Sequence, residues 1–279
     1  MRRLSLTGIL TLIPLVGLLT TGCKDRAVDQ PAAEIAVTNS YLASAVRDLC
    51  GDGTEVMSLA PPGMCPGHFD ISPVQVNRLR HCRALLLFDF QAPVVASLTR
   101  LKDKGLKTHL VQGPTGLCVP DSYLATCHAV AAILTDQYPE RASELTQRLK
   151  AIAQRLDSLS SELQAQVQTA AVVDAPILSS NHQVKFAQWL GLQSVATFVG
   201  SDSETVSNID HCLKRAAGSD VRFVIANQQE GTALARALAD RLKARAVVFS
   251  NFPAHGEEGP GFDRLLRDNV GRLLGTVVP

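Results

Sequence analysis

Short, almost uninterrupted apolar runs recur along the chain, and they constrain its fold more than any other feature. A strand with one face in water alternates apolar and polar residues, whereas a strand buried on both faces of a parallel sheet is apolar almost throughout. The runs therefore predict buried parallel strands. They cover residues 34–38, 55–60, 84–89, 107–111, 171–178, 194–199, 221–226 and 245–250.

Stretches with helical patterning separate these runs, at residues 40–50, 73–82, 92–104, 182–190, 204–217 and 231–243. Strands that alternate with helices are typical of crossover units in an α/β fold. The runs also fall into two groups, one on each side of residues 138–168. We therefore expect an α/β protein with two lobes, each a roughly four-stranded parallel sheet flanked by helices.

Residues 138–168 predict one long helix between the lobes. Pro139 suits a first helical turn, and no glycine or further proline follows until Pro176. At 1.5 Å per residue this helix would be about 45 Å long. We expect it to be rigid and to pack on both lobes, 34–137 and 169–279, and the alternative is the seam of a coiled-coil dimer. Its apolar residues recur at spacings of three and four, at Leu145, Leu149, Ile152, Leu156, Leu159 and Leu163.

Residues 1–22 have the features of a secretory signal peptide. Arg2 and Arg3 precede an apolar run that is shorter than the roughly 20 residues needed to span a bilayer. Gly22 and Cys23 resemble a lipobox, the site at which bacterial lipoproteins are cleaved and acylated, although Thr20 replaces the usual leucine. We predict a lipid anchor at Cys23 and a linker over 23–33. The alternative is an ordinary cleaved signal.

Without residues 1–22 the chain is almost neutral, because loss of Arg2 and Arg3 lowers Lys plus Arg from 27 to 25, against 26 Asp plus Glu. Nucleic-acid-binding proteins need a basic face, so we expect no nucleic-acid partner. Export implies an oxidising compartment, and we expect one or two disulfides, whose pairing the sequence leaves open. The cysteines after Cys23 are Cys50, Cys65, Cys82, Cys118, Cys127 and Cys212.

The segment PPGMCPGHFDISP (residues 61–73) is a candidate binding loop, because its prolines exclude a continuous helix and functional residues are common on such loops. It resembles a motif of the zinc/manganese-type solute-binding proteins of bacterial ABC importers. In that family a PPG segment precedes a histidine, an aromatic residue, an acid and a proline. His68 falls on the family's first metal-ligand histidine.

The resemblance extends from about residue 34 to the end of the chain. It implies an exported protein, often a lipoprotein, that binds a metal ion between two α/β lobes joined by a long helix. The implied partner is a membrane permease, and we expect a monomer on the periplasmic or extracellular face of the membrane. It also implies a binding protein rather than an enzyme.

The family's second motif is a proline-histidine pair, and here Asp121 stands at the histidine position in VPDSYLAT (119–126). An aspartate oxygen can bind zinc or manganese. The alternative is that Asp121 caps the apolar helix that follows it.

The third motif is a histidine before an aromatic-alanine pair and a Gly-Leu, which are Phe186-Ala187 and Gly191-Leu192 in this chain. Ser180 stands at the histidine position, and His182 lies two residues later. Asn181 and a preceding serine are suited to capping the helix, which would leave His182 in its first turn. His182 is therefore either a ligand or a polar surface residue.

The fourth position is an acid, and Glu204 is the candidate. Its alternative role is a favourable interaction with the helix dipole in a first turn. The aspartate that the family places after its last strand is Ser250 here, followed by Asn251. A set of His68, His182 and Asp121 or Glu204 suits zinc, whereas manganese, the alternative cargo, prefers more oxygen ligands.

These residues favour capture of a divalent metal, zinc first, for delivery to an ABC permease. The second hypothesis is a protein of the same fold whose altered site no longer binds metal and which acts as a scaffold, adhesin or receptor. A metallohydrolase would need an open zinc position and a general base, and no HExxH motif is present.

Overall fold

The computed structural model describes residues 35–51, 54–61, 71–91, 106–200, 203–254 and 260–276. The predicted signal peptide (1–22), linker (23–33) and helix at 92–104 lie outside these residues, as do the candidates Cys23 and His68. Within the described residues no helix is long and apolar enough to cross a membrane.

The first sheet is parallel and has the strand order β2-β1-β3-β4. Its strands are β1 (Ile35–Val37), β2 (Val56–Ser58), β3 (Ala84–Phe88) and β4 (Lys107–Val111). The second sheet is also parallel, with the order β6-β5-β7-β8. Its strands are β5 (Pro176–Ser180), β6 (Gln193–Phe198), β7 (Phe223–Asn227) and β8 (Arg245–Phe249).

The two sheets have the same topology, in which the chain runs outward in opposite directions from a central pair of strands. That pair is β1 and β3 in the first sheet and β5 and β7 in the second. In open α/β sheets, ligands bind beyond the carboxyl ends of the strands at such a switch point. Residues that follow β5 and β7 are therefore placed where a ligand would be expected.

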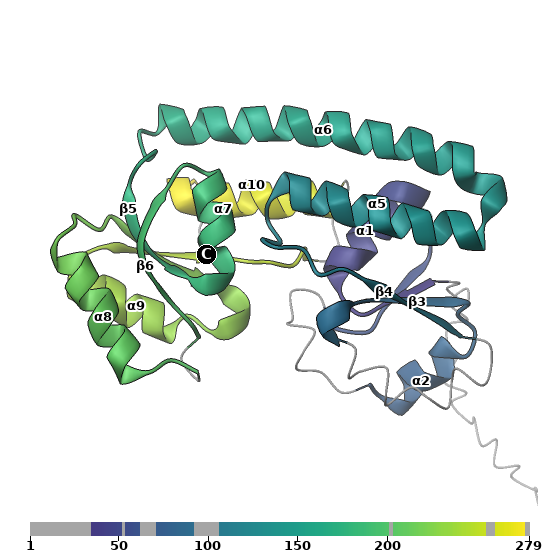
Figure 1. Cartoon of the computed structure of the whole chain (residues 1–279), viewed down its shortest axis with the longest axis horizontal. Coiled ribbons are helices and arrows are strands. Elements are labelled where there is room, and N and C mark those ends of the chain that lie inside the picture. Colours follow the sequence, from purple (N-terminus) through teal and green to yellow (C-terminus); the bar gives the residue numbers. More distant parts are fainter. Residues whose placement is uncertain are drawn as a thin grey trace, which may run out of the picture. The chain divides into compact units, whose positions relative to one another are not determined.

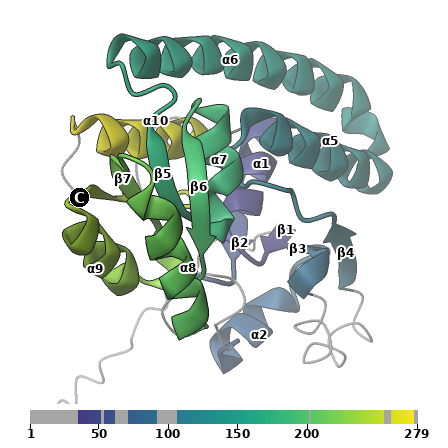
Figure 2. The same ribbon diagram turned by 60° about the vertical axis from the view of Figure 1, so that its left-hand side comes forward.

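Helices connect the strands and cover the sheets, as Figures 1 and 2 show. The α-helices are α1 (Ser40–Cys50), α2 (Pro73–Leu79), α5 (Pro120–Gln137), α6 (Ala142–Thr169), α7 (Val184–Trp189), α8 (Val206–Ala217), α9 (Ala233–Leu242) and α10 (Gly261–Leu274). Short 3-10 turns are η1 (Asp89–Gln91), η2 (Pro139–Arg141), η3 (Asn181–Gln183) and η4 (Gln228–Glu230).

The long helix α6 packs against α5 and α10 (Figure 1), which confirms the prediction of a helix shared by both lobes. The buried face of α6 belongs to one hydrophobic cluster that includes Val37 and Phe88 from the first sheet and Ile177 and Phe249 from the second. Because this face is buried within the chain itself, the coiled-coil alternative is wrong. The buried residues of α6 are Leu145, Ile152, Leu156, Leu159, Leu163 and Val167, and Leu149 packs beside them partly buried.

The opposite face of each sheet has its own core, because successive residues of a strand point to opposite faces. Ala36 and Leu85 pack with Leu79 of α2. Leu178 and Val224 pack with α8 and α9. The central strands β1, β3, β5 and β7 are buried on both faces, which explains their continuous apolar runs, whereas the edge strands β4, β6 and β8 are partly exposed.

Two elements differ from the sequence predictions. The strand expected at 171–178 begins only at Pro176, because residues before it form a turn in which Ala171 and Asp174 have positive φ angles of 51° and 59°. The C-terminal helix α10 was not predicted. The lobe boundaries expected at 34–137 and 169–279 stay predictions.

The expectation of disulfides is wrong for the cysteines that the structure describes. Cys50, Cys82, Cys118, Cys127 and Cys212 are all free thiols. All but Cys50 are buried, and each lies in its own part of the apolar core or against a backbone carbonyl. Cys65 lies outside the described residues.

Candidate functional site

The carboxyl end of β5 places His182 in the turn η3. Ser180 ends the strand, and its side-chain oxygen accepts a hydrogen bond of 3.2 Å from the backbone N–H of His182. This contact ends the strand and starts the turn, since a serine oxygen satisfies an N–H that has no partner in the helix. A serine cap before His182 was predicted, and Ser180 is that cap. The prediction that His182 lies in the first turn of the helix is wrong, because His182 belongs to the 3-10 turn η3 and α7 begins at Val184 with no side-chain cap.

Glu230, in the turn η4 after β7, lies beside His182. Its Oε1 is 3.2 Å from His182 Nε2, and its Oε2 accepts a hydrogen bond of 2.6 Å from Ser180 Oγ. The side chain of Glu230 is 19% exposed and that of His182 is 61% exposed. β5 and β7 are neighbours in the sheet, so the two residues lie on either side of the switch point.

A buried network of neutral amides lies next to this pair. Gln183 Nε2 donates to Asn227 Oδ1 at 3.1 Å and to Asn251 Oδ1 at 2.9 Å. All three side chains are buried, and Gln183 Oε1 has no hydrogen-bond partner in the described part of the chain. This network joins the carboxyl ends of β5, β7 and β8 without any charged group.

The end of β8 is likewise neutral. Ser250 stands where the resemblance implies a metal-binding aspartate, and its backbone N–H donates to Asn269 Oδ1 at 2.9 Å. Asn269 Nδ2 donates to the carbonyl of Ser250 at 2.9 Å. The Cys118 thiol donates to the same carbonyl at 3.0 Å. The amide of Asn269 and the thiol of Cys118 therefore satisfy the hydrogen bonds of the Ser250 backbone. The end of β8 supplies no negative charge to a metal site.

Burial raises the pKa of the Cys118 thiol far above its ordinary value, and the hydrogen bond from Asn269 only partly opposes that rise. A thiolate is the form that binds metal. The Cys118 thiol stays protonated, so we assign it a packing role between the loop before α5 and the end of β8 and not the role of a metal ligand.

Glu204 lies in the loop before α8, where N–H groups surround its carboxylate. Oε2 accepts from the backbone N–H of Val199 at 2.7 Å and from Asn208 Nδ2 at 3.0 Å. Oε1 accepts from the backbone N–H of Thr205 at 2.7 Å. These contacts fix the loop and the start of α8. Glu204 lies before the N-cap Thr205 and no acid is in the first turn of α8, so the alternative considered for this residue, an acid in the first helical turn, is wrong.

Asp121 is the second residue of α5 and is exposed. The N-cap is Val119, and no side chain caps this helix. The expectation that Asp121 is the cap is therefore wrong. An acid in the first turn is still stabilised by the helix dipole.

The described residues do not bring the candidate ligands into one cluster. No group of three or more His, Cys, Asp or Glu side chains among them is arranged to hold a metal ion. His182 is paired with Glu230, Glu204 is bound within its own loop, and Asp121 lies in the first turn of α5. The loop with His68 lies outside the described residues, although α2 after it begins with a capping box between Ser72 and Gln75.

Sequence reasoning did not identify Glu230. The available signal was an acid four residues after the buried run at 221–226, followed by Gly231. Such an acid is placed at the carboxyl edge of a parallel sheet, but its partners on β5 are about fifty residues away along the chain. Only the strand order brings Glu230 next to Ser180 and His182.

Solved structures with the same fold include ZnuA and a periplasmic metal binding protein. A crystal structure of ZnuA shares 16% identity over 88% of this chain and 98% of its own, with a TM-score of 0.71. The Mn-bound periplasmic metal binding protein from Candidatus Liberibacter asiaticus shares 14% identity over 87% of this chain and 98% of its own, with a TM-score of 0.72. The Cd-bound form of that protein matches equally well. Identities this low establish the fold alone.

No curated protein matches this sequence. A family model does: the model for ZnuA, described as zinc-uptake complex component A, periplasmic, matches residues 119–275. That match spans more than half of the chain, including the three candidate residues Asp121, His182 and Glu204, and the two parallel sheets with the shared long helix agree with it. The chain therefore belongs to the ZnuA family.

Proposed function

We propose that this protein binds a divalent transition metal ion outside the inner membrane and delivers it to an ABC importer. Zinc is the proposed cargo, with manganese as the alternative. The family match over residues 119–275 carries the proposal. The fold supports it, because structural neighbours with this architecture are described as Mn-bound and Cd-bound proteins. The proposed role involves capture and release of the ion and no catalysed reaction.

The proposed ligands are His68, Asp121 and His182. Imidazole nitrogens and a carboxylate oxygen are the ligand types that tetrahedral zinc sites use. Glu204 as a fourth ligand stays a prediction. Its two oxygens already accept N–H groups of its own loop, so binding a metal would compete with those hydrogen bonds.

We also propose that residues 1–22 are removed on export and that Cys23 carries a lipid anchor. The protein would then be held at the periplasmic or extracellular face of the membrane, as a monomer, close to its permease. The packing of α6 on both lobes supports small movements of loops during capture, because bending a continuous helix breaks backbone hydrogen bonds.

The neutral network at the end of β8 supports a second candidate function. Ser250 and Asn269 satisfy each other where a charged ligand would be needed, and the described residues contain no group of three or more possible ligands. A protein with this fold that has lost its metal site would act as a scaffold, adhesin or receptor.

Calorimetric titration with zinc and with manganese separates the two candidates. The purified chain, without a histidine tag, should bind one zinc ion per chain, and His68→Ala should weaken that binding at least tenfold. Absence of binding by the wild-type chain to either metal would contradict metal capture and support the scaffold function. Tighter binding of manganese than zinc would change the proposed cargo.

A further inference from the structure

The separation of His182 from Glu230 matches the separation of two ligands of one zinc ion. Ligand nitrogen and oxygen atoms lie about 2.0–2.1 Å from zinc, and at a tetrahedral angle two such atoms are about 3.3 Å apart. His182 Nε2 and Glu230 Oε1 are 3.2 Å apart. A zinc ion could therefore bind both atoms without a change in their separation, once the imidazole rotates so that the Nε2 lone pair points at the ion.

The local structure fixes Glu230 in this position. Ser180 Oγ donates to Oε2, which leaves Oε1 directed at His182. A Cβ atom on Gly200 would lie 2.7 Å from the Cβ of Glu230 and 2.8 Å from its carbonyl oxygen, so the loop after β6 approaches Glu230 as closely as a glycine allows. Hydrogen bonds to the second oxygen of a ligating carboxylate are usual around metal ions.

The environment of Glu230 favours a cation. Its side chain is only 19% exposed, and withdrawing an ionised carboxylate from water costs free energy unless an opposite charge compensates. Its oxygens contact a hydroxyl and an imidazole, and the adjacent network of Gln183, Asn227 and Asn251 is neutral. Neutral His182 supplies no positive charge, so a divalent ion bound to this form would provide one, and the exposed face of His182 leaves room for further ligands.

Glu204 lacks these features, because backbone and amide N–H groups already surround its carboxylate. We propose, on the basis of the proposed function, that Glu230 is the carboxylate ligand that shares the metal ion with His182, and that Ser180 positions it. The remaining ligands are water or residues outside this pair. The carboxylate beside His182 therefore comes from the turn after β7, and Asp121 of α5 stays a separate proposed ligand.

The test measures zinc affinity by competition with a chromophoric chelator at one fixed pH, for the wild-type chain, Glu230→Gln and Glu204→Gln, which removes the rival candidate acid. Glu230→Gln should weaken zinc binding by roughly 100-fold, since loss of even an outer hydrogen-bond partner weakens metal sites 10- to 100-fold. Glu204→Gln should stay within about threefold of wild type. Ser180→Ala, which keeps the carboxylate but frees it to move, should weaken binding by about tenfold.

A second readout distinguishes ligation from a general loss of structure. The imidazole nitrogen signals of His182, assigned by their absence in His182→Ala, should shift on zinc addition in the wild-type chain and in Glu204→Gln. If the apo form of Glu230→Gln has a lower melting temperature than wild type, Glu230→Asp provides the affinity comparison, because it keeps the charge but withdraws the oxygen from His182.

The outcomes separate this inference from the proposed function. Wild-type binding with unchanged affinity in Glu230→Gln would overturn the role of Glu230 and leave metal capture intact. Weakened binding in Glu204→Gln alone would assign the acid to Glu204 and also overturn the inference. No zinc binding by the wild-type chain would overturn both.

Discussion

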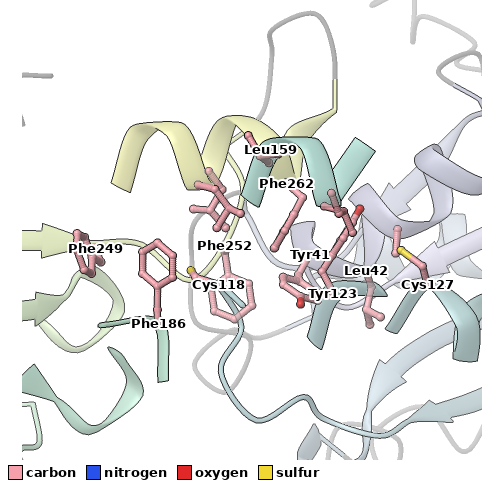
Figure 3. Close-up of a cluster of buried hydrophobic side chains, with 14 of the residues drawn as sticks. Tyr41, Leu42, Cys118, Tyr123, Cys127, Leu159, Phe186, Phe249, Phe252 and Phe262 are labelled. Carbon is pink, nitrogen blue, oxygen red and sulfur yellow. The ribbon is translucent and has the colours of Figure 1, made fainter. Parts of the chain in front are cut away.

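Phe262 of α10 stacks face to face on Tyr123 of α5, with ring centroids 3.9 Å apart and ring planes 2° apart. Tyr41 of α1 meets both rings edge-on, at 5.3 Å from Tyr123 and 5.8 Å from Phe262. All three rings are buried, and Figure 3 shows them as one cluster. Because α10 follows the last strand of the second sheet and α1 follows the first strand of the first, this cluster joins the two lobes.

Replacing Phe262 by alanine should therefore destabilise the whole protein. Loss of a buried phenylalanine side chain typically costs about 3–5 kcal/mol, and urea denaturation would measure the change in the free energy of unfolding. Val206→Ala, at a position 84% exposed, is the control and should change it by less than about 0.5 kcal/mol. Similar stabilities for the two variants would contradict the role of this cluster.

Arg155 of α6 forms ion pairs with α1, which follows the first strand of the first sheet, and with α10, which follows the last strand of the second sheet. Its Nη2 is 2.5 Å from Asp48 of α1, and its Nε is 3.1 Å from Asp263 of α10. Arg155→Met would leave two carboxylates, 6% and 15% exposed, without their cation. Breaking a fully buried pair costs about 3–5 kcal/mol, and since Arg155 is partly exposed we expect about 2 kcal/mol.

Lys150→Met on an exposed position of the same helix is the matched control for Arg155→Met. Urea denaturation of both variants at neutral pH should show a loss of stability for Arg155→Met only. Equal free energies of unfolding for the two variants would mean that the ion pairs of Arg155 contribute nothing to the stability of the protein.

Asp263 should make stability depend on pH. Burial raises the pKa of this carboxyl above its ordinary value of about 3.9, and Arg155 only partly opposes the rise. The folded chain then binds the Asp263 proton more tightly than the unfolded chain does. The contribution of this residue to the free energy of unfolding therefore falls as pH rises from about 3.9 through the raised pKa.

The measurement compares wild type with Asp263→Asn, which does not titrate, by urea denaturation between about pH 3.5 and pH 7. The free energy of unfolding of wild type, relative to that of the variant, should decrease as pH rises. An increase over the same range would mean that attraction to Arg155 outweighs burial and that the pKa is lowered.

The reactivity of the cysteine thiols tests their burial in the fold, and it needs no metal. Burial raises the pKa of the Cys82 thiol to about 11, with Arg78 opposing the rise, and raises that of Cys127 further. Reaction with a thiol reagent at neutral pH needs the thiolate, so these thiols should react slowly in the folded chain. In denaturant without reductant, all 5 described thiols of a Cys23→Ser, Cys65→Ser variant should react with the reagent. A smaller number of reactive thiols would indicate a disulfide.

The sequence was sufficient for α6 and for the existence of every strand that the structure describes, because α6 has one buried apolar stripe and the central strands are buried on both faces. It did not locate the start of β5, which begins at Pro176 after a turn. It predicted a serine cap before His182, since a serine at the end of an apolar run is a local capping signal, although the helix itself begins only at Val184. It could not identify Glu230 as the partner of His182, because that contact depends on β5 and β7 being neighbours. It missed α10 for a similar reason: the buried face of that helix packs on distant elements, and Phe262 alone does not reveal them.

For Glu204, a sequence pattern alone suggested a ligand, whereas the contacts of the acid favour a structural role. An acid at a position where the family often carries one suggests a ligand, yet an acid before a helix has N–H groups available within its own loop. The contacts with Val199 and Thr205 favour that local role. The distinction depends on where the carboxylate points, which spacing alone does not determine.

Metal content, measured by mass spectrometry, tests the central claim most directly. The untagged chain would be loaded with zinc, dialysed against metal-free buffer and compared with His182→Ala prepared in the same way. Metal capture predicts about one zinc ion per wild-type chain, by the stoichiometry of a single structural site, and a clear loss of zinc in the variant. A wild-type chain that retains no zinc or manganese would contradict the account, whatever the variants show.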